Sequence, residues 1–435
     1  MSIFRQNIYA LLSGTFLMIA AGSAMAQKIP DTVDDKVTIR FYNYNLASAG
    51  MGRDATVEMI DSFRAANPNI TVEGVPVPSP EMISRIQADV VAGLAPDIVQ
   101  VVFSDLSYIM ENFGISPLED LVSSEELGAH FDGIIPAGLE LGRIDGKTYG
   151  LAYVFSTPVL FYNADMFRAA GLDPDASLAI WDDVSAAART ITEKTGKTGF
   201  LSGVFKAGFD WLLQGLVLSS GGRVLSEDRK TLTFAEPEAM EAIAMLRGLA
   251  QAGAYKDMPG GAAIEQMVSG GGGMFLGTSA VQASLLRGAK GNFELRAAPM
   301  PAFGDKPARP TNSGSALVIM ARDPVKQRAA WELMKHLTSD YAYNIITAKI
   351  GYVPLRTTTI EGEEFLAPWL RENPLAKINI DQLSHMSPWV PIPGPNYKQI
   401  ASLILSAGEQ AVFGQGDPQQ VMSDAQRRAQ ALMPN

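Results

Sequence analysis

The apolar and polar positions of this chain alternate between short strand-like runs and longer helix-like stretches. Residues 37–41 alternate apolar and polar side chains, which is typical of a half-buried strand. A stretch with helical spacing follows and ends at Asn67-Pro68, and residues 70–72 and 98–103 are apolar runs that predict two further strands. This β-α-β-α-β opening predicts an α/β protein in which helices cover a parallel sheet.

One long apolar stretch, residues 149–163, indicates where the chain passes between two parts of the fold. It is rich in β-branched and aromatic side chains, and Pro158 interrupts it. Because proline cannot donate to a central ladder of hydrogen bonds, we expect two strands that meet at a bend, which suits a hinge. Residues 293–300 predict the return crossover, and residues 315–321 predict a strand buried on both faces.

Helix signals fill the last part of the chain. Asp323-Pro324 offers an N-cap and a first-turn proline. The apolar face of the helix that follows consists of Ala330, Leu333, Met334 and Leu337. Further helices are predicted to begin near Tyr397 and Pro418.

Length and composition limit the class of protein. A chain of 435 residues is too long for one compact core, so we expect two lobes. The chain has no cysteine, which excludes disulfides and thiolate metal sites. Its formal net charge of −11 and pI near 4.9 argue against a nucleic-acid partner, which would require clustered lysine and arginine.

The N-terminal segment has the pattern of a secretory signal peptide. Arg5 precedes an apolar stretch at residues 8–21, and Ala24-Met25-Ala26 has small residues where a signal peptidase cleaves. The apolar part is shorter than the roughly 20 residues of a membrane-spanning helix. We therefore predict a signal peptide over residues 1–26, cleavage after Ala26, and a mature protein in the periplasm. The alternative is a buried N-terminal helix.

No catalytic motif stands out. The three histidines, His130, His336 and His385, lack the spacing of a zinc helix, and no G-x-S-x-G motif is present. Gly272 and Gly277 have the spacing of a phosphate loop, but Thr278 stands where that motif requires lysine. We predict no enzymatic activity, no cofactor and no metal. Because carboxylate pairs are numerous, a secreted carbohydrate-active hydrolase or lyase remains an alternative.

Several stretches, in order along the chain, resemble the extracellular solute-binding proteins of bacterial ABC importers, in the group that serves sugars and glycerol phosphate. They are residues 63–68, 95–98, 144–151, 158–163, 167–172 and 180–184. This resemblance implies a periplasmic binding protein fold, with two α/β lobes joined by a multi-crossover hinge and the ligand cleft between them. It assigns residues 27–152 and 303–351 to the N-terminal lobe, and residues 153–302 and 352–435 to the C-terminal lobe.

The resemblance also implies partners and a role. The ligand would be a small solute of the sugar, polyol or glycerophosphate type. The protein would be a monomer that delivers this solute to the transmembrane subunits of an ABC permease, which a separate ATPase drives.

Ligand contacts carry over from the glycerol-3-phosphate-binding members of the group, which residues 156–160 and 351–355 resemble most. The positions are Ser156, Ser279, Gly314, Tyr352 and, as a pocket tryptophan, Trp211. The group's ligand-binding tyrosine and glutamate align here with Ser79 and Phe103. Its arginine has no counterpart, because no arginine lies between Arg371 and Arg427. A dianionic phosphate is best held by such a guanidinium, so a neutral sugar stays an alternative ligand.

The residues themselves point to further binding candidates. Tyr42 and Asn43 follow the first predicted strand at its carboxyl end, where open α/β sheets bind ligands. Tyr44 and Trp389 are further aromatic surfaces for a sugar ring, and packing on the surface of a lobe is the alternative role of all these aromatic residues. Ser279 lies at a predicted helix start, which could bind an anion through backbone N–H groups or only cap the helix.

Overall fold

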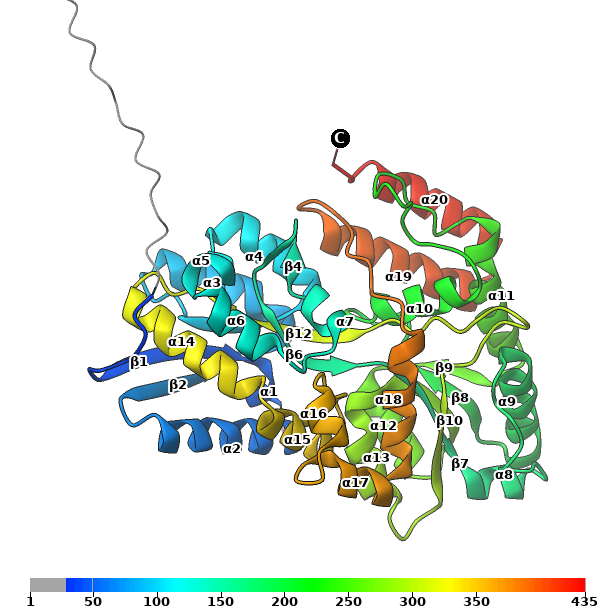
Figure 1. Cartoon of the computed structure of the whole chain (residues 1–435). Helices are drawn as coiled ribbons and strands as arrows, with labels where there is room; N and C mark the ends of the chain where they lie inside the picture. The colour runs from blue at the N-terminus through cyan, green and yellow to red at the C-terminus, as the bar shows by residue number, and fades with distance from the viewer. Residues whose placement is uncertain (1–28, 49, 435) are drawn as a thin grey trace, which may run out of the picture.

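The computed structural model describes residues 29–48 and 50–434 and shows two α/β lobes lying side by side (Figure 1). The predicted signal peptide lies outside the described residues. None of the described helices is both long enough and apolar enough to span a membrane.

The first lobe is built on a five-stranded mixed sheet. Its strands, in spatial order, are β2 (Ile70–Pro76), β1 (Val37–Asn43), β3 (Ile98–Val102), β12 (Ser313–Ile319) and β6 (Leu151–Ser156). β1 pairs in parallel with β2 and β3, as the β-α-β-α-β pattern predicted. β12 is buried along almost its whole length, as predicted, but it runs antiparallel to β3 and β6.

Helices cover both faces of this sheet because successive side chains of each strand point to opposite faces. Ile39 and Phe41 of β1 pack against one layer of helices, whereas Tyr42 packs against the other. The first-lobe helices are α1 (Tyr44–Ala47), α2 (Met51–Ala66), α3 (Met82–Val91), α4 (Leu106–Phe113), α5 (Leu118–Leu121), α6 (Ser124–Phe131), α7 (Pro136–Glu140), α14 (Pro324–Leu337) and α15 (Asp340–Lys349). A small hairpin joins β4 (Arg143–Ile144) to β5 (Lys147–Thr148).

The second lobe has its own five-stranded sheet. Its strands, in spatial order, are β11 (Leu295–Pro299), β7 (Pro158–Asn163), β10 (Gly272–Thr278), β8 (Thr198–Ser202) and β9 (Tyr255–Asp257). Alternation again divides the core, because Leu160 and Tyr162 of β7 face one layer and Val159 and Phe161 face the other. The helices of this lobe are α8 (Ala164–Ala169), α9 (Trp181–Thr195), α10 (Asp210–Ser219), α11 (Pro237–Gln251), α12 (Gly260–Val268), α13 (Gln282–Ala289), α19 (Tyr397–Phe413) and α20 (Pro418–Gln430).

The chain passes between the lobes in three stretches of the described residues. The first is Thr157, between β6 and β7, so the predicted bend near Pro158 is confirmed. The second follows β11; residues 293–300 are therefore not the crossover itself, because β11 pairs with β7 as an edge strand. The third contains three short helices, α16 (Thr357–Glu361), α17 (Leu366–Glu372) and α18 (Pro374–Asp381), and continues to α19.

These stretches shift the lobe limits relative to the expected ones. The expected limit after residue 152 falls inside β6, which belongs to the first sheet. Residues 303–311 contact the second lobe, since Phe303 lies in its core and the backbone N–H of Arg309 donates to the Ser219 hydroxyl. Val353 and Leu355 pack in the core of the first lobe, beyond the expected limit at 351.

A single glutamine links all three crossing stretches. The Gln382 side chain donates from Nε2 to the Pro158 carbonyl at 3.1 Å and accepts from the Met300 backbone N–H at 2.9 Å. Its side chain is buried, so both bonds are protected from water. The three stretches therefore form one packed hinge rather than three independent linkers.

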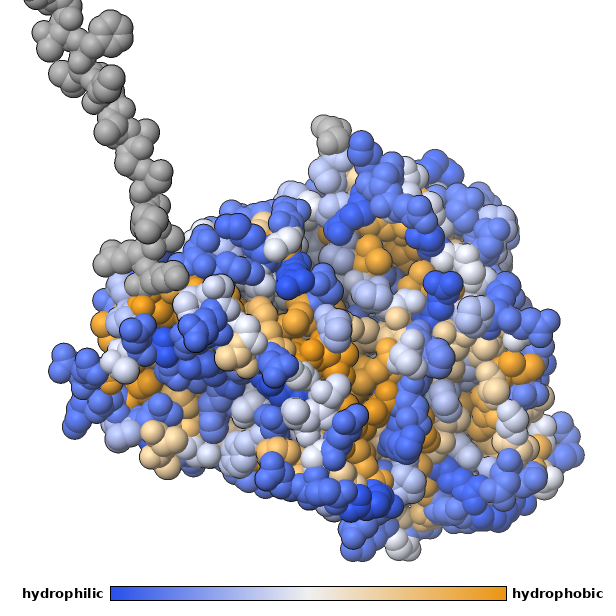
Figure 2. Space-filling model, in the orientation of Figure 1, coloured by the Kyte–Doolittle hydropathy of each residue, from blue (hydrophilic) through white to orange (hydrophobic). Residues whose placement is uncertain are grey.

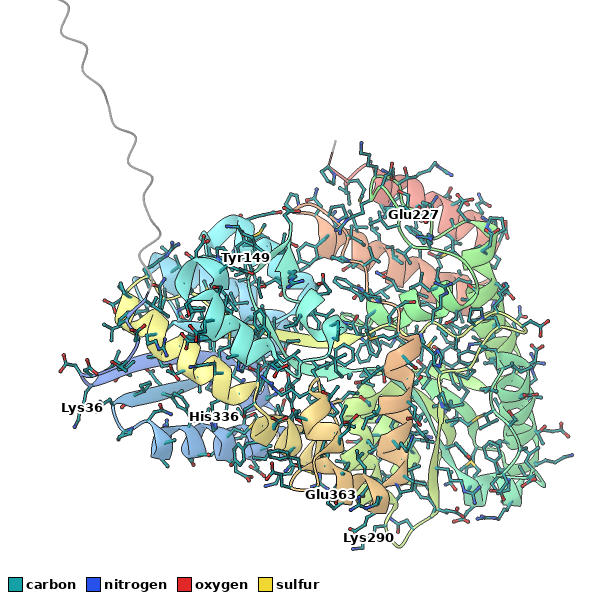
Figure 3. All side chains as sticks on the ribbon, viewed as in Figure 1. Lys36, Tyr149, Glu227, Lys290, His336 and Glu363 are labelled. Atoms are coloured by element: carbon teal, nitrogen blue, oxygen red, sulfur yellow. The ribbon has the colours of Figure 1, made fainter. Side chains whose placement is uncertain are left out.

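Charged residues cover the outside of both lobes. Lys36, Glu227, Lys290 and Glu363 are exposed and lie at the periphery (Figure 3). Figure 2 shows hydrophilic residues over most of the visible face, with apolar residues in a band where the lobes meet and in smaller patches elsewhere. A binding site between the lobes would be less polar than the surrounding surface.

One partly buried ion-pair cluster ties α6 to α14 in the first lobe. Glu126 accepts two hydrogen bonds from Arg328, at 2.9 and 3.0 Å, and one each from Trp331 and Lys335. Burial alone would raise the pKa of Glu126, but these hydrogen bonds outweigh it and lower the pKa to about 2 from an ordinary value of 4.5. The carboxylate is therefore more stable as an anion in the folded protein.

We expect Glu126→Gln to lower the free energy of unfolding by about 1–3 kcal/mol at pH 7, because Arg328 and Lys335 each lose one carboxylate partner and keep only Glu332. Since folding lowers this pKa, the stabilisation is present above pH 4.5 and disappears as the pH falls toward 2. Urea unfolding of both proteins at pH 7 and pH 3 would measure this difference. The adjacent exposed residue supplies the control, Glu125→Gln, and an equal loss in that variant would contradict the role of Glu126.

Candidate functional site

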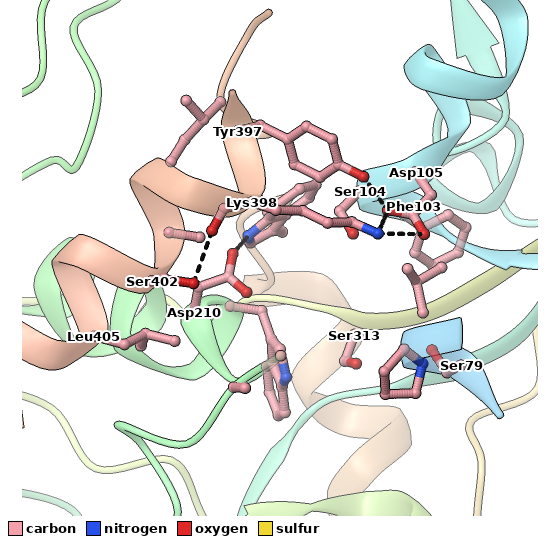
Figure 4. Close-up of a pocket in the computed structure, with 18 of the residues that line it drawn as sticks. Ser79, Phe103, Ser104, Asp105, Asp210, Ser313, Tyr397, Lys398, Ser402 and Leu405 are labelled. Atoms are coloured by element: carbon pink, nitrogen blue, oxygen red, sulfur yellow. Dashed lines mark hydrogen bonds and ion pairs between the residues drawn. The ribbon is translucent and has the colours of Figure 1, made fainter. Parts of the chain in front are cut away.

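A cavity of about 310 Å³ lies between the two lobes. The first lobe contributes Ser79, Phe103, Asp105 and Gly314. The second lobe contributes Asp210, Trp211, Trp389, Tyr397 and Lys398. Figure 4 shows these walls facing each other. The volume suits a small molecule, since ligand pockets measure about 300–1,000 Å³.

The secondary structure explains why these residues meet. Phe103 and Asp105 follow directly after β3, at the carboxyl end of a strand in the parallel part of the first sheet. Asp210 and Trp211 open α10, just after Gly208 turns the chain with a φ of 80°. Tyr397 begins α19. The cavity is therefore lined by strand ends and helix starts. At these places, backbone and side-chain polar groups are not all hydrogen-bonded within their own strand or helix.

Gly314 allows the first-lobe wall to form. Its φ is 137°, and a Cβ atom there would lie 2.0 Å from the Val154 carbonyl oxygen. Another residue at this position would have to move β12 away from β6, so glycine is required by both conformation and space. The same residue lines the cavity, which explains why the start of β12 can approach a ligand closely.

Asp105 joins the two lobes through a contact that we call the Asp105 clasp, made of Asp105, Tyr397 and Lys398 (Figure 4). The Tyr397 hydroxyl donates to Asp105, and the Lys398 ammonium lies 3.3 Å from the same carboxylate. The Asp105 side chain is 2% exposed and that of Lys398 is 53% exposed, so the clasp reaches from the interior to the surface. Burial raises the pKa of Asp105 although Lys398 and Tyr397 act in the opposite direction.

Trp389 is held at both ends by polar residues of the cavity wall. Its indole Nε1 donates to Asp210 at 3.0 Å, and its backbone N–H donates to the Asn312 side-chain oxygen at 2.9 Å. Burial raises the pKa of Asp210, partly offset by the hydrogen bond from Trp389, and the negative charge of Asp105 raises it further. The indole is thereby fixed as a rigid aromatic wall.

Four of the predicted binding residues line this cavity, namely Ser79, Phe103, Trp211 and Gly314. Trp211 also packs into the core of the second lobe and is only 6% exposed, so one edge of its ring serves the fold. These four residues come from both lobes, as a site between lobes requires.

Three other predicted residues lie near the hinge and are not among the residues that line the cavity. Ser156 pairs with the cavity-lining Ser313 in the register of β6 and β12. The Ser279 hydroxyl accepts from the Thr157 backbone N–H at 3.4 Å. Tyr352 lies beside Tyr44, and burial raises the pKa of Tyr44 to about 12 and that of Tyr352 well above its ordinary value. Both phenols therefore stay neutral.

Tyr42 and Asn43 are placed elsewhere, and the structure corrects the reasoning that put them in the site. Tyr42 is fully buried in the core between the first sheet and α3, and its hydroxyl donates to Asp89. Asn43 is the N-cap of α1, where its side-chain oxygen accepts from the Leu46 backbone N–H at 2.9 Å. The end of β1 meets packed side chains, because α1 begins directly there.

Sequence reasoning missed Asp105, Asp210, Asn312, Tyr397 and Lys398. Asp105 could have been found from its place just after the apolar strand β3, because open α/β sheets bind ligands at the carboxyl ends of their strands. We applied this rule to β1 instead. For the other four there was no local signal, because the hinge brings them together from distant parts of the chain. Trp389, proposed as an aromatic platform, does line the cavity.

The lining of this cavity combines polar, charged and aromatic side chains. No histidine is among its lining residues. Nowhere in the described part of the chain do three or more histidine, aspartate or glutamate side chains gather as a metal site would require. Aromatic rings, hydroxyls, one amide and two carboxylates can contact a small polar solute from both lobes.

Comparison with known proteins supports this interpretation. The family model described as bacterial extracellular solute-binding protein matches residues 58–374. A putative binding protein of Brucella abortus is 24% identical over 436 residues, which cover 97% of this chain and 97% of that protein. The sn-glycerol-3-phosphate-binding periplasmic protein UgpB of Pectobacterium atrosepticum is 24% identical over 440 residues, covering 96% of this chain and 94% of UgpB.

Solved structures share the fold. UgpB from Mycobacterium tuberculosis in complex with glycerophosphocholine superposes with a TM-score of 0.81, at 20% identity, over 91% of this chain and 98% of that one. The cyclic alpha-maltosyl-1,6-maltose binding protein from Arthrobacter globiformis gives a TM-score of 0.77, at 20% identity, over 91% and 99% of the two chains. The two-lobed periplasmic binding protein fold is thus confirmed. The chain belongs to the bacterial extracellular solute-binding proteins, and its role is to bind the substrate of an ABC importer.

Proposed function

We propose that this protein captures a small hydroxylated solute, of the carbohydrate or glycerol-derived class, in the cavity between its lobes and delivers it to the transmembrane subunits of an ABC permease. The observation that carries the proposal is the cavity itself, which both lobes line with aromatic and polar side chains. Closure of two lobes around a solute is a common way for a hinged protein to bind. We further propose that the mature protein acts as a periplasmic monomer, released after cleavage at Ala26.

The relatives support the solute class. Two are named for sn-glycerol 3-phosphate and for a cyclic maltosyl-maltose, and one structure holds glycerophosphocholine. Of these ligand types, a phosphate monoester fits the charges of the cavity least well. Lys398 is the cation of its wall, and this lysine is already paired with Asp105. Without a free guanidinium or ammonium, a dianion would be poorly compensated.

We infer that the chain performs no reaction of its own. The members of the family compared above are binding proteins. A carbohydrate-active enzyme would release products from a polysaccharide, and replacement of Asp105 or Asp210 would abolish that release. Absence of products from a panel of polysaccharides would support simple binding.

Ligand binding should raise the melting temperature. A solute bound to the folded state alone, at 100 times its dissociation constant, adds about 2.7 kcal/mol of stability. Thermal melts against sugars, polyols and their phosphate esters would identify the class, and phosphate monoesters should give the smallest shifts. A flat response to the whole panel would contradict the proposed function.

Trp389→Ala should weaken solute binding at least roughly tenfold while the protein stays folded, because the indole forms a partly buried wall of the cavity. Titration calorimetry would measure the affinity and circular dichroism the fold. Trp369→Ala in α17 is the matched control, since Trp369 does not line the cavity. Equal affinities in the two variants would remove Trp389 from the site.

Tyr397→Phe should shift the protein toward more open forms and weaken binding of any solute by roughly tenfold, because the hydroxyl's bond to Asp105 joins the lobes. Small-angle scattering with and without solute would measure the change in dimensions. Tyr341→Phe on the exposed surface of α15 is the control. If scattering and affinity were the same for both variants, the clasp would have no part in closure.

A further inference from the structure

The two carboxylates of the cavity differ in how their charges are compensated. Asp105 is neutralised within the protein by Lys398 and also accepts from Tyr397. Asp210 takes part in none of the ion pairs formed by the described residues, and the other charge that acts on it most is the negative charge of Asp105. Figure 4 shows the two carboxylates approaching the cavity from opposite lobes. An ionised Asp210 thus gives the wall one negative charge that no cation among the described residues balances.

Part of the compensation for Asp210 comes from its place in the fold. It is the first residue of α10, where free backbone N–H groups and the helix dipole stabilise an anion. One carboxylate oxygen also accepts from the Trp389 indole. These interactions explain how the charge is tolerated without a solute. Burial nevertheless raises the pKa of Asp210, so they do not replace the lost hydration completely.

The surroundings of Asp210 are aromatic. The Trp389 indole donates a hydrogen bond to Asp210, and Trp211 follows Asp210 in α10. Tyr397 and Phe103 are the other aromatic residues that line the cavity. Aromatic faces attract a cation through the ring quadrupole, most strongly for tryptophan, and more so in a site shielded from water. The Asp210 carboxylate and the surrounding aromatic rings therefore both favour a positively charged ligand.

On the basis of the proposed function, we propose that the captured solute carries a positively charged ammonium group, which lies between the Asp210 carboxylate and the aromatic rings of Trp211 and Trp389. A neutral hydroxyl could donate to Asp210 but would leave its charge without a counterion. An anionic group at the same place would be repelled by both carboxylates. A methylated ammonium fits best, because its apolar surface suits the aromatic wall and it needs no hydrogen-bond acceptor.

Asn312 fixes the position of the aromatic wall beside Asp210. Its side chain is 1% exposed, lines the cavity, and uses its oxygen to hold the Trp389 backbone. Its Nδ2 has no hydrogen-bond partner among the described residues. A buried amide donor of this kind is stabilised when it meets an oxygen. Because this atom has almost no accessible surface, a solute oxygen could reach it only after the Asn312 side chain moved, and the ammonium site does not depend on that contact.

A pair of probes with the same shape tests the charge. Choline and 3,3-dimethylbutan-1-ol differ in that a quaternary nitrogen replaces a carbon, so their difference in affinity reports the charge alone. Titration calorimetry and tryptophan fluorescence of the full mature chain should show choline binding roughly tenfold to a hundredfold more tightly. Asp210→Asn should bring this ratio close to one, because asparagine keeps an acceptor for the Trp389 indole but loses the charge.

Asp182→Asn is the control, because Asp182 is likewise a carboxylate in the first turn of a helix, α9, but is exposed to solvent and lies outside the cavity. It should keep the wild-type ratio. Equal binding of the two probes, no measurable binding of choline at millimolar concentration, or a ratio unchanged by Asp210→Asn would overturn the inference. If neutral sugars or polyols then still raise the melting temperature, the proposed function stands without the charge. If they do not, the proposed function fails as well.

Discussion

The packing of the three crossing stretches against one another is the constraint on which the rest of the molecule depends. Gln382 of the third stretch donates to the carbonyl of Pro158, directly after the first stretch, and accepts from Met300 of the second. Asn312 of the second stretch accepts a hydrogen bond from Trp389 of the third. Each stretch is thereby located relative to the others by buried hydrogen bonds, which are costly to leave unmade. Because the stretches end at strand ends and helix starts, they also decide which polar groups from the two lobes face one cavity.

The two aspartates of the cavity have different roles because their charges have different partners. Asp105 accepts a hydrogen bond from Tyr397 and pairs with Lys398, and these contacts join the two lobes. Asp210 is supported by a helix start and an indole, and its charge is open toward the cavity. In a region poorly screened by water, this difference matters more than the formal charge of the whole chain, which acts over the solvent-exposed surface and is weakened by salt.

The sequence predicted the elements well where one local rule decided them. The alternation at residues 37–41, the helix ending at Asn67, the bend at Pro158 and the capped helix after Asp323 are all present. Errors arose where pairing decided the outcome, as for residues 293–300, which form an edge strand rather than a crossover. The prediction of Tyr42 as a binding residue was also decided by tertiary packing, because Tyr42 lies in the core. Whether the end of a strand faces a cavity or a packed helix depends on the segment that follows the strand.

What the sequence by itself determined is therefore the class of the molecule: an α/β chain of two lobes with a proline-marked crossing and a family resemblance to solute-binding proteins. The α/β pattern and the proline-marked crossing rest on hydrophobic periodicity and backbone stereochemistry, which act over a few residues. The two lobes followed from the length of the chain, and the family from a resemblance in several ordered stretches. Only the tertiary structure decided the site, because Asp105, Asp210, Asn312, Trp389 and Tyr397 are far apart in sequence and meet through the hinge. Their charges and hydrogen bonds depend on distance and burial, and neither quantity exists until the two sheets are placed against each other.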